Sequence, residues 1–253
     1  MDEALCKAAR LLRNARHAFA LTGAGLSVAS GIPDFRSPGG LWSRHDPMEV
    51  ATAEALRFAP RRVWEFLVDA LATLRQAKPN PGHVALARLE REGRLEAVVT
   101  QNIDGLHQTA GSRHVIEFHG GIGRYYCMGC GREYDPALAY RLTSRDIPWL
   151  CDACGQMVRP DIVFFGEGIP LDALNKSDQL ALAADVIVVA GTSGEVAPAN
   201  HLPEAVKARG GVIVEINLTE STFSDLADVR IVAPAEEALP VLADLVLSQP
   251  LTR

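Results

Sequence analysis

Four cysteines have the spacing of ligands to a single metal ion. They form two pairs, Cys127-x2-Cys130 and Cys151-x2-Cys154, and twenty residues separate the pairs. Each pair lets two thiolates approach one ion from a tight turn, which is close to the spacing of zinc ribbons. Four sulfur ligands leave no open coordination position, so the pattern favours a structural Zn²⁺ over a catalytic one. A redox dithiol is the alternative, and the remaining Cys6 is interpreted as an ordinary helix residue.

A glycine-rich segment follows the apolar run at 17–21. Its first turn consists of Gly23, Ala24 and Gly25. The backbone N–H groups of such a turn could bind a phosphate, although many short glycine turns only let a strand meet a helix. Further along lie an acid, an aromatic ring and a base: Asp34, Phe35 and Arg36. Taken alone, these three residues would be interpreted as a surface loop.

A second polar cluster follows the apolar run at 96–100. It contains Gln101, Asn102 and Asp104, which come directly after the predicted strand. Because a nucleotide lies at the carboxyl ends of parallel strands, these groups could bond a ribose. They could equally cap the next helix. His119, between Phe118 and Gly120, is either a general base or a core histidine whose ring nitrogens are hydrogen-bonded.

The elements that would position these groups alternate between buried strands and amphipathic helices. We predict strands at 17–21, 96–100, 161–165, 185–191, 212–217 and 229–233. We predict helices near the N-terminus and at 61–77, 82–92, 172–183, 200–209 and 235–248. This alternation predicts an α/β fold: a Rossmann-like, doubly wound parallel sheet covered on both faces. A small zinc-binding module and a helical insert interrupt the pattern.

Bulk composition narrows the class of protein. The chain has 253 residues, 48% of them hydrophobic, with a formal net charge of -6. The acidic balance disfavours nucleic-acid binding but allows a basic peptide as partner. No apolar run reaches the length of about 18–20 residues that a membrane helix needs, and the charged N-terminus is unlike a signal peptide. We therefore expect a cytoplasmic enzyme with no membrane partner.

Taken together, the clusters resemble the sirtuin family across roughly residues 15 to 245. Besides the four cysteines, the residues that carry the resemblance are Gly23-Ala24-Gly25-x-Ser27, Gly31-Ile32-Pro33-Asp34-Phe35-Arg36, Gln101-Asn102-Ile103-Asp104, His119-Gly120, Val163-Phe164-Phe165-Gly166-Glu167, Gly191-Thr192-Ser193 and Pro198-Ala199. Their order and spacing are those of the family. The resemblance implies three parts: a Rossmann domain (1–34, 76–123 and 159–253), a cofactor loop with a helical insert (35–75) and a zinc-ribbon module (124–158).

The resemblance implies an NAD-dependent protein lysine deacylase that yields nicotinamide, O-acyl-ADP-ribose and free lysine. His119 matches the family's general base, and a neutral imidazole suits that role near pH 7. Asn102 and Asp104 match residues that hold the nicotinamide ribose. The implied NAD-binding set is Gly23, Ala24, Gly25, Asp34, Phe35, Arg36, Gln101, Asn102, Ile103, Asp104, Gly191, Thr192, Ser193, Asn217 and Leu218. Ser193 and Asn217 match the adenosine end.

The resemblance also implies where an acyl-lysine peptide would bind. Val163, Phe165, Gly166 and Glu167 match the strip that pairs with the peptide backbone by strand addition. In the branch that prefers succinyl-lysine, a small alanine is followed by Tyr-x-x-Arg, whose arginine binds the acyl carboxylate. Here the corresponding residues are Ala51, Leu67 and Ala70. We therefore expect a neutral pocket that accepts acetyl and longer uncharged acyl groups but binds succinyl poorly.

Other functions share parts of these motifs. A mono-ADP-ribosyltransferase would use the same NAD chemistry, as would a plain NAD hydrolase, and a non-catalytic NAD sensor would bind without reaction. A Rossmann dehydrogenase is disfavoured, because the acid expected about 20 residues after the glycine loop is not clearly placed in this sequence. A zinc-ribbon nucleic-acid binder conflicts with the sequence pI of about 5.7. We expect a monomer acting on acyl-lysine proteins or peptides.

Overall fold

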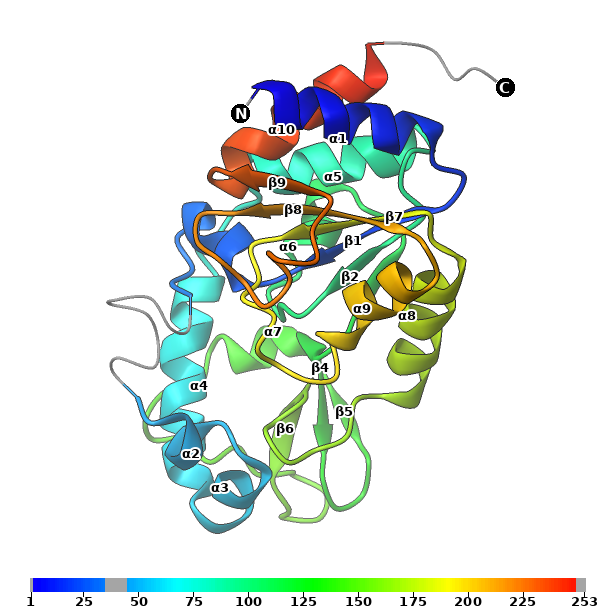
Figure 1. Cartoon of the computed structure of the whole chain (residues 1–253). Coiled ribbons are helices and arrows are strands. Elements are labelled where there is room, and N and C mark those ends of the chain that lie inside the picture. Colours follow the sequence, from blue (N-terminus) through cyan, green and yellow to red (C-terminus); the bar gives the residue numbers. More distant parts are fainter. Residues whose placement is uncertain (1, 35–44, 249–253) are drawn as a thin grey trace.

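A six-stranded parallel sheet forms the centre of the protein. The computed structural model describes residues 2–34 and 45–248. The strands of this sheet are β1 (Ala18–Thr22), β2 (Val98–Thr100), β3 (Val115–Glu117), β7 (Val186–Ala190), β8 (Val212–Asn217) and β9 (Val229–Val232). Their order is β3-β2-β1-β7-β8-β9 (Figure 1). The chain thus reverses direction across the sheet between β1 and β7, the place where doubly wound sheets bind nucleotides. The predicted Rossmann-like fold is confirmed.

Helices cover both faces of this sheet. One face packs against α1 (Asp2–Asn14), α5 (Pro81–Arg91) and α10 (Ala235–Leu247), and the other against α8 (Leu171–Ala183) and α9 (His201–Ala208). Each strand packs against both helical layers, because successive side chains along a strand point to opposite faces of the sheet. In β7, Val188 joins the first apolar cluster and Val189 the second. Strands buried on both sides explain the continuous apolar runs in the sequence.

A smaller, antiparallel sheet and a group of helices lie beside one another below the main sheet (Figure 1). The sheet has the order β5-β4-β6 and consists of β4 (Gly120–Cys127), β5 (Glu133–Tyr134) and β6 (Val158–Ile162), with α7 (Pro136–Ala139) beside it. The helices are α2 (Pro47–Val50), α3 (Ala53–Phe58) and α4 (Pro60–Leu74). The fully buried Trp64 of α4 and Tyr125 of β4 share the apolar cluster that joins these two groups.

Two short helices follow β1 and its neighbour β2. The 3-10 helix η1 (Ala24–Ser30) comes after β1, and α6 (Leu106–Ala110) comes after β2. Both therefore begin at the carboxyl edge of the main sheet. That edge carries most of the polar residues that the sequence singles out.

The predicted strand at 161–165 is wrong in its extent and its sheet. The strand β6 ends at Ile162 and pairs antiparallel with β4, not with the parallel sheet. Beyond it, the backbone of Phe165 forms an isolated parallel bridge with Thr52 of the helical insert. An apolar run indicates a strand but does not identify the partner strand, which is why the sequence misled here.

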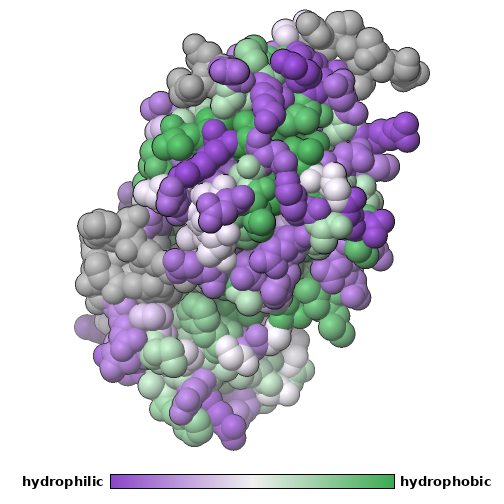
Figure 2. Space-filling model, in the orientation of Figure 1, coloured by the Kyte–Doolittle hydropathy of each residue, from purple (hydrophilic) through white to green (hydrophobic). Residues whose placement is uncertain are grey.

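Hydrophilic residues dominate much of the face drawn in Figure 2, with smaller hydrophobic patches between them. Large apolar side chains exposed on the described surface include Met48 and Phe58 of the helical group and Phe165, which follows β6. Among residues 2–34 and 45–248, no helix combines the length and apolarity that crossing a membrane requires.

Candidate functional site

Two glycine loops meet at the reversal point of the main sheet. The Gly23 N–H donates to the Ala190 carbonyl at 3.1 Å, and the Gly25 N–H donates to the Gly191 carbonyl at 2.8 Å. A Cβ on Gly25 would lie 2.9 Å from Gly191 Cα, and one on Gly191 would lie 2.3 Å from Leu26 N. Gly191 also has a φ of 64°, which disfavours other residues. Only glycines allow the β1 and β7 loops to approach this closely.

The polar residues after β2 line the same edge. The Gln101 side-chain N–H donates to Thr192 Oγ1 at 2.9 Å, and Asn102 Nδ2 donates to the Gly23 carbonyl at 3.0 Å. Asp104 accepts the Leu106 N–H through Oδ1 at 2.9 Å, so it also helps to begin α6. The alternatives of ribose binding and helix capping are therefore not exclusive for this cluster.

Ser27 joins Asn102 to Asp104. Its hydroxyl accepts from Asn102 Nδ2 at 3.1 Å and donates to Asp104 Oδ2 at 2.7 Å. His83 Nε2 lies 3.5 Å from the same hydroxyl. Sequence reasoning included Ser27 in a motif but gave neither residue a role. The sequence around each residue does not reveal these contacts, because they join segments more than fifty residues apart in the chain.

Two buried histidines lie beneath this network. His83 and His107 have ring centroids 4.9 Å apart, and His107 Nε2 lies 2.9 Å from Thr22 Oγ1. Burial lowers the pKa of His83 to about 4, even though the nearby Asp104 carboxylate opposes the shift. Burial and the neighbouring His83 lower the pKa of His107 to about 3. Both rings are therefore neutral at physiological pH.

His119 lies where the second sheet begins. Its Nδ1 is 3.0 Å from the Gln101 carbonyl oxygen, which can only accept, so Nδ1 carries the proton. The other ring nitrogen, Nε2, then has an available lone pair. Burial lowers the pKa of His119, while the hydrogen bond to Gln101 opposes that shift. A half-buried, neutral imidazole of this tautomer is suited to accept a proton.

The expected adenosine side lies between β7 and β8. Thr192 N–H donates to Asn217 Oδ1 at 3.1 Å, and Asn217 Nδ2 donates back to the Thr192 carbonyl at 3.1 Å. Ser193 and Leu218 are exposed beside this clamp, whereas Asp34 is half-buried. Ile103 is held by the Ile122 N–H, which donates to its carbonyl at 3.2 Å. The predicted Phe35 and Arg36 lie outside the described residues.

Some backbone groups of the strip predicted to pair with a peptide already form hydrogen bonds within the protein. The Phe165 N–H donates to the Ala51 carbonyl and the Phe165 carbonyl accepts from Ala53 N–H, each at 2.9 Å. The Val163 N–H donates to the His119 carbonyl at 2.8 Å. The backbone groups of Phe165 are therefore engaged with the helical insert, whereas Gly166 is exposed.

The Glu167 carboxylate is bound by Arg159, whose side chain is 5% exposed. Arg159 donates to both carboxylate oxygens, at 2.5 and 2.8 Å, and the Phe164 N–H donates at 2.9 Å. Burial would raise the pKa of Glu167, but the bonds from Arg159 and Phe164 hold it below its ordinary value. These contacts give Glu167 an anchoring role within the strip.

The three positions expected at the acyl pocket differ in burial. Ala51 and Ala70 are half-buried, while Leu67 is 5% exposed and packs in the cluster that joins α4 to the second sheet. None of these side chains can carry a charge. Near them, α2 and α4 border a hollow of about 280 Å³ lined by His45, Asp46, Glu49, Val50, Arg62, Glu65, Phe66 and Asp69.

The four cysteines converge at one end of the second sheet and are arranged to hold a zinc ion. All four Sγ atoms lie within 4.8 Å of one another. The Sγ distances are 3.4 Å between Cys127 and Cys154 and 3.7 Å between Cys130 and Cys151. A tetrahedral site with Zn–S bonds of about 2.3 Å requires sulfur separations of about 3.8 Å, so the donor set fits.

Comparison with known proteins agrees with this geometry. The sequence model of the Sir2 family matches residues 23–198. The NAD-dependent protein deacylase 2 of Pyrobaculum aerophilum is 44% identical over 245 residues, which is 97% of this chain and 97% of that protein.

Two solved structures extend the likeness to three dimensions. A Sir2 homologue mutant in complex with ADP-ribose has a TM-score of 0.91 at 40% identity, covering 100% of both chains. A Sir2 mutant with a deacetylated p53 peptide and 3′-O-acetyl ADP-ribose has a TM-score of 0.89 at 38% identity, covering 94% of this chain and 96% of that one.

Proposed function

Because this chain belongs to the Sir2 family, we propose that it is an NAD-dependent protein deacylase that removes acyl groups from lysine side chains. The observation that carries the proposal is the position of Gln101. Its carbonyl binds His119 Nδ1, and its side chain binds Thr192 of the β7 loop. One residue thus links a proton acceptor to a nucleotide-binding edge.

We assign His119 as the general base of the reaction. Its Nδ1–H is fixed on Gln101, so Nε2 is the nitrogen that takes a proton from a ribose hydroxyl. The lowered pKa keeps the ring neutral at pH 7, ready for that transfer. Asn102 and Asp104, held by Ser27, position the nicotinamide ribose.

NAD supplies an electrophilic anomeric carbon, which the acyl oxygen attacks as nicotinamide leaves. The ribose hydroxyl that gives its proton to His119 then attacks the acyl carbon, and one water is consumed as the bond between that carbon and the lysine nitrogen breaks. The products proposed are free lysine, nicotinamide and O-acyl-ADP-ribose. Support for the last product comes from the relative whose structure contains 3′-O-acetyl ADP-ribose beside a deacetylated peptide. The zinc ion has no place in these steps, since four thiolates would close its coordination sphere.

We propose that acetyl and longer neutral acyl groups are accepted and that succinyl is poor. Leu67 and Ala70 carry no charge, so a buried acyl carboxylate would lack a partner at these positions. An unpaired buried charge costs several kcal/mol. The expectations of a monomer in the cytoplasm and of the three-part division of the chain stay predictions.

Mass spectrometry of an acetyl-lysine peptide tests the function. The peptide is incubated with the enzyme, with and without NAD, beside His119→Ala. The matched control is His114→Ala, which removes an exposed histidine paired with Glu90. We expect NAD-dependent deacetylation and O-acetyl-ADP-ribose with the wild type and the control, and neither with His119→Ala.

Other outcomes point to the rival functions. NAD consumed while the peptide keeps its acetyl group would favour ADP-ribosyl transfer or NAD hydrolysis, which labelled NAD on protein would separate. Rates on acetyl, butyryl and succinyl versions of one peptide test the acyl preference, and efficient desuccinylation would contradict the neutral pocket.

A further inference from the structure

A carboxylate with no exposed surface lies behind the expected adenosine side. Glu215 is in the middle of β8, where the alternation of side chains along a strand puts it on the same face as the buried Ile213. Taking an ionised carboxylate out of water is costly unless several donors replace the water. The buried carboxylate of Glu215 therefore requires hydrogen-bond donors from the residues around it.

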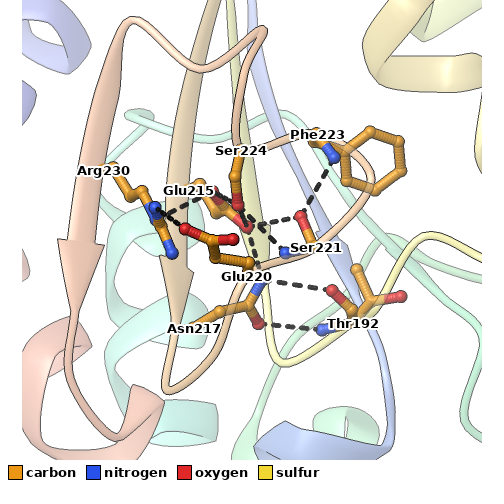
Figure 3. A network of polar contacts seen from close by, with 8 residues as sticks. All are labelled: Thr192, Glu215, Asn217, Glu220, Ser221, Phe223, Ser224 and Arg230. Carbon is orange, nitrogen blue, oxygen red and sulfur yellow. Dashed lines mark hydrogen bonds and ion pairs between the residues drawn. The ribbon is translucent and has the colours of Figure 1, made fainter.

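Three donors from nearby residues meet this carboxylate (Figure 3). Asn217 Nδ2 donates to Oε1 at 2.9 Å, the Ser224 hydroxyl donates to Oε2 at 2.8 Å, and the Ser221 hydroxyl donates to Oε1 through a short bond. Arg230 Nε lies 3.8 Å away, within ion-pair range. The carboxylate thus determines where Asn217 and the segment 221–224 lie.

Asn217 connects Glu215 to Thr192, in the loop that follows β7. With one amide N–H bound to Glu215, its other N–H and its carbonyl oxygen bond both backbone groups of Thr192. Thr192 in turn accepts from Gln101, whose carbonyl holds His119. A continuous path of hydrogen bonds therefore runs from Glu215 to the proposed general base.

The segment 221–224 provides a second route to the same loop. The Thr222 N–H donates to the Ser193 carbonyl at 3.0 Å, and the Thr222 hydroxyl donates to the Gly194 carbonyl at 3.1 Å. A Cβ on Gly194 would lie 2.1 Å from Thr222 Oγ1 and 2.6 Å from the Phe223 ring. This close packing, together with a φ of 75°, explains why a glycine precedes Glu195.

We infer that Glu215 is a positioning residue for NAD binding: it fixes the loop 191–194 from beneath through Asn217 and through the segment 221–224. The inference rests on the proposed function, because it requires NAD to lie against that loop. Glu215 has no exposed surface and so acts only through these partners. Its loss should weaken the binding of NAD more than the reaction of bound NAD.

Calorimetric titration with NAD and steady-state kinetics on Glu215→Gln test this inference. The substitution keeps the side-chain shape but presents an amide group to three hydrogen-bond donors. We expect the Kd and KM for NAD to rise roughly tenfold, which corresponds to about 1.4 kcal/mol. At saturating NAD, kcat should stay within about twofold of the wild-type value.

Two variants serve as controls. Ile213→Val creates a small cavity on the same strand, so it should lower Tm without changing the KM for NAD. Glu220→Gln removes a carboxylate that is 80% exposed and pairs with Arg230, so it should change neither quantity. A KM rise in Ile213→Val as large as that in Glu215→Gln would mean that destabilisation alone explains the effect.

The outcomes separate this inference from the proposed function. If the wild type does not bind NAD, the proposed function fails. If the wild type binds NAD and a folded Glu215→Gln binds it equally well, the inference is overturned. Should Glu215→Gln not fold, Ser221→Ala and Ser224→Ala each remove one donor; a smaller KM rise supports the inference, and unchanged NAD binding in both overturns it.

Discussion

Removing the Glu167 carboxylate should destabilise the protein rather than simply weaken peptide binding. The change is Glu167→Ala, which leaves the Arg159 guanidinium with two backbone carbonyl acceptors, Pro160 and Ile162. The side chain of Arg159 is 5% exposed, so little water can replace the lost carboxylate. The variant therefore buries a positive charge without its counterion.

The size of the effect follows from burial. Removing one partner of a buried ion pair lowers the free energy of unfolding by about 3–5 kcal/mol, whereas an exposed ion pair contributes about 0–1 kcal/mol. Since 27% of the Glu167 side chain is exposed, we expect the lower end of the buried range, about 3 kcal/mol. For a chain of this size that corresponds to a Tm lower by roughly 6–12 °C.

Urea denaturation at pH 7.5 with zinc present measures the free energy of unfolding. Asp244→Ala is the matched control, because its pair with Arg88 is exposed and its loss should cost less than about 0.5 kcal/mol. The pKa of Glu167 is lowered in the folded state, so its contribution is present above about pH 4.3 and is lost as pH falls through the folded pKa. A loss below about 1 kcal/mol, with a higher KM for peptide, would refute this reasoning and favour direct substrate contact.

Three further predictions concern titration and the metal. Because burial lowers the pKa of His119, the acid limb of kcat/KM should lie below pH 6.5; a limb above that value would contradict the neutral base. NMR of the imidazole rings should show His83 neutral above about pH 4 and His107 neutral above about pH 3; protonation of either near pH 6.5 would contradict their burial. Zinc analysis should find one ion per chain, and chelation or Cys151→Ala should lower Tm; unchanged stability after zinc removal would contradict a structural ion.

Much of the fold could be predicted because the sequence carries repeated local signals. The apolar residues at 186–190 predict the strand at 185–191, and the structure buries all of β7 between two helical layers. The glycine turn after β1 was predicted as part of a site, and the close approach of Gly25 to Gly191 explains its composition. The cysteine spacing predicted a convergence that four sulfur positions reproduce.

What the sequence did not provide was the partner of each group. The apolar run at 161–165 indicated a strand but not that β6 pairs with β4, because pairing depends on segments distant in the chain. Motif matching singled out Asn217 and Glu167 but could not show that a buried acid holds one and a buried arginine the other. Ser27 and His83 received no role for the same reason.

The attachment of the zinc module determines how it could be exchanged between relatives. The chain leaves the main sheet through β4 and returns through β6, and Gly120 pairs with Ile162 where the two strands meet the rest of the protein. Directly beyond that pair, the Val163 N–H binds the His119 carbonyl. A chimera should therefore be joined at Gly120 on one strand and at Ile162 on the other. The pairing of these two residues is then kept, whatever the length of the module taken from the relative. A junction shifted by one residue on one strand would turn Val163 to the opposite face and release the backbone of the proposed base.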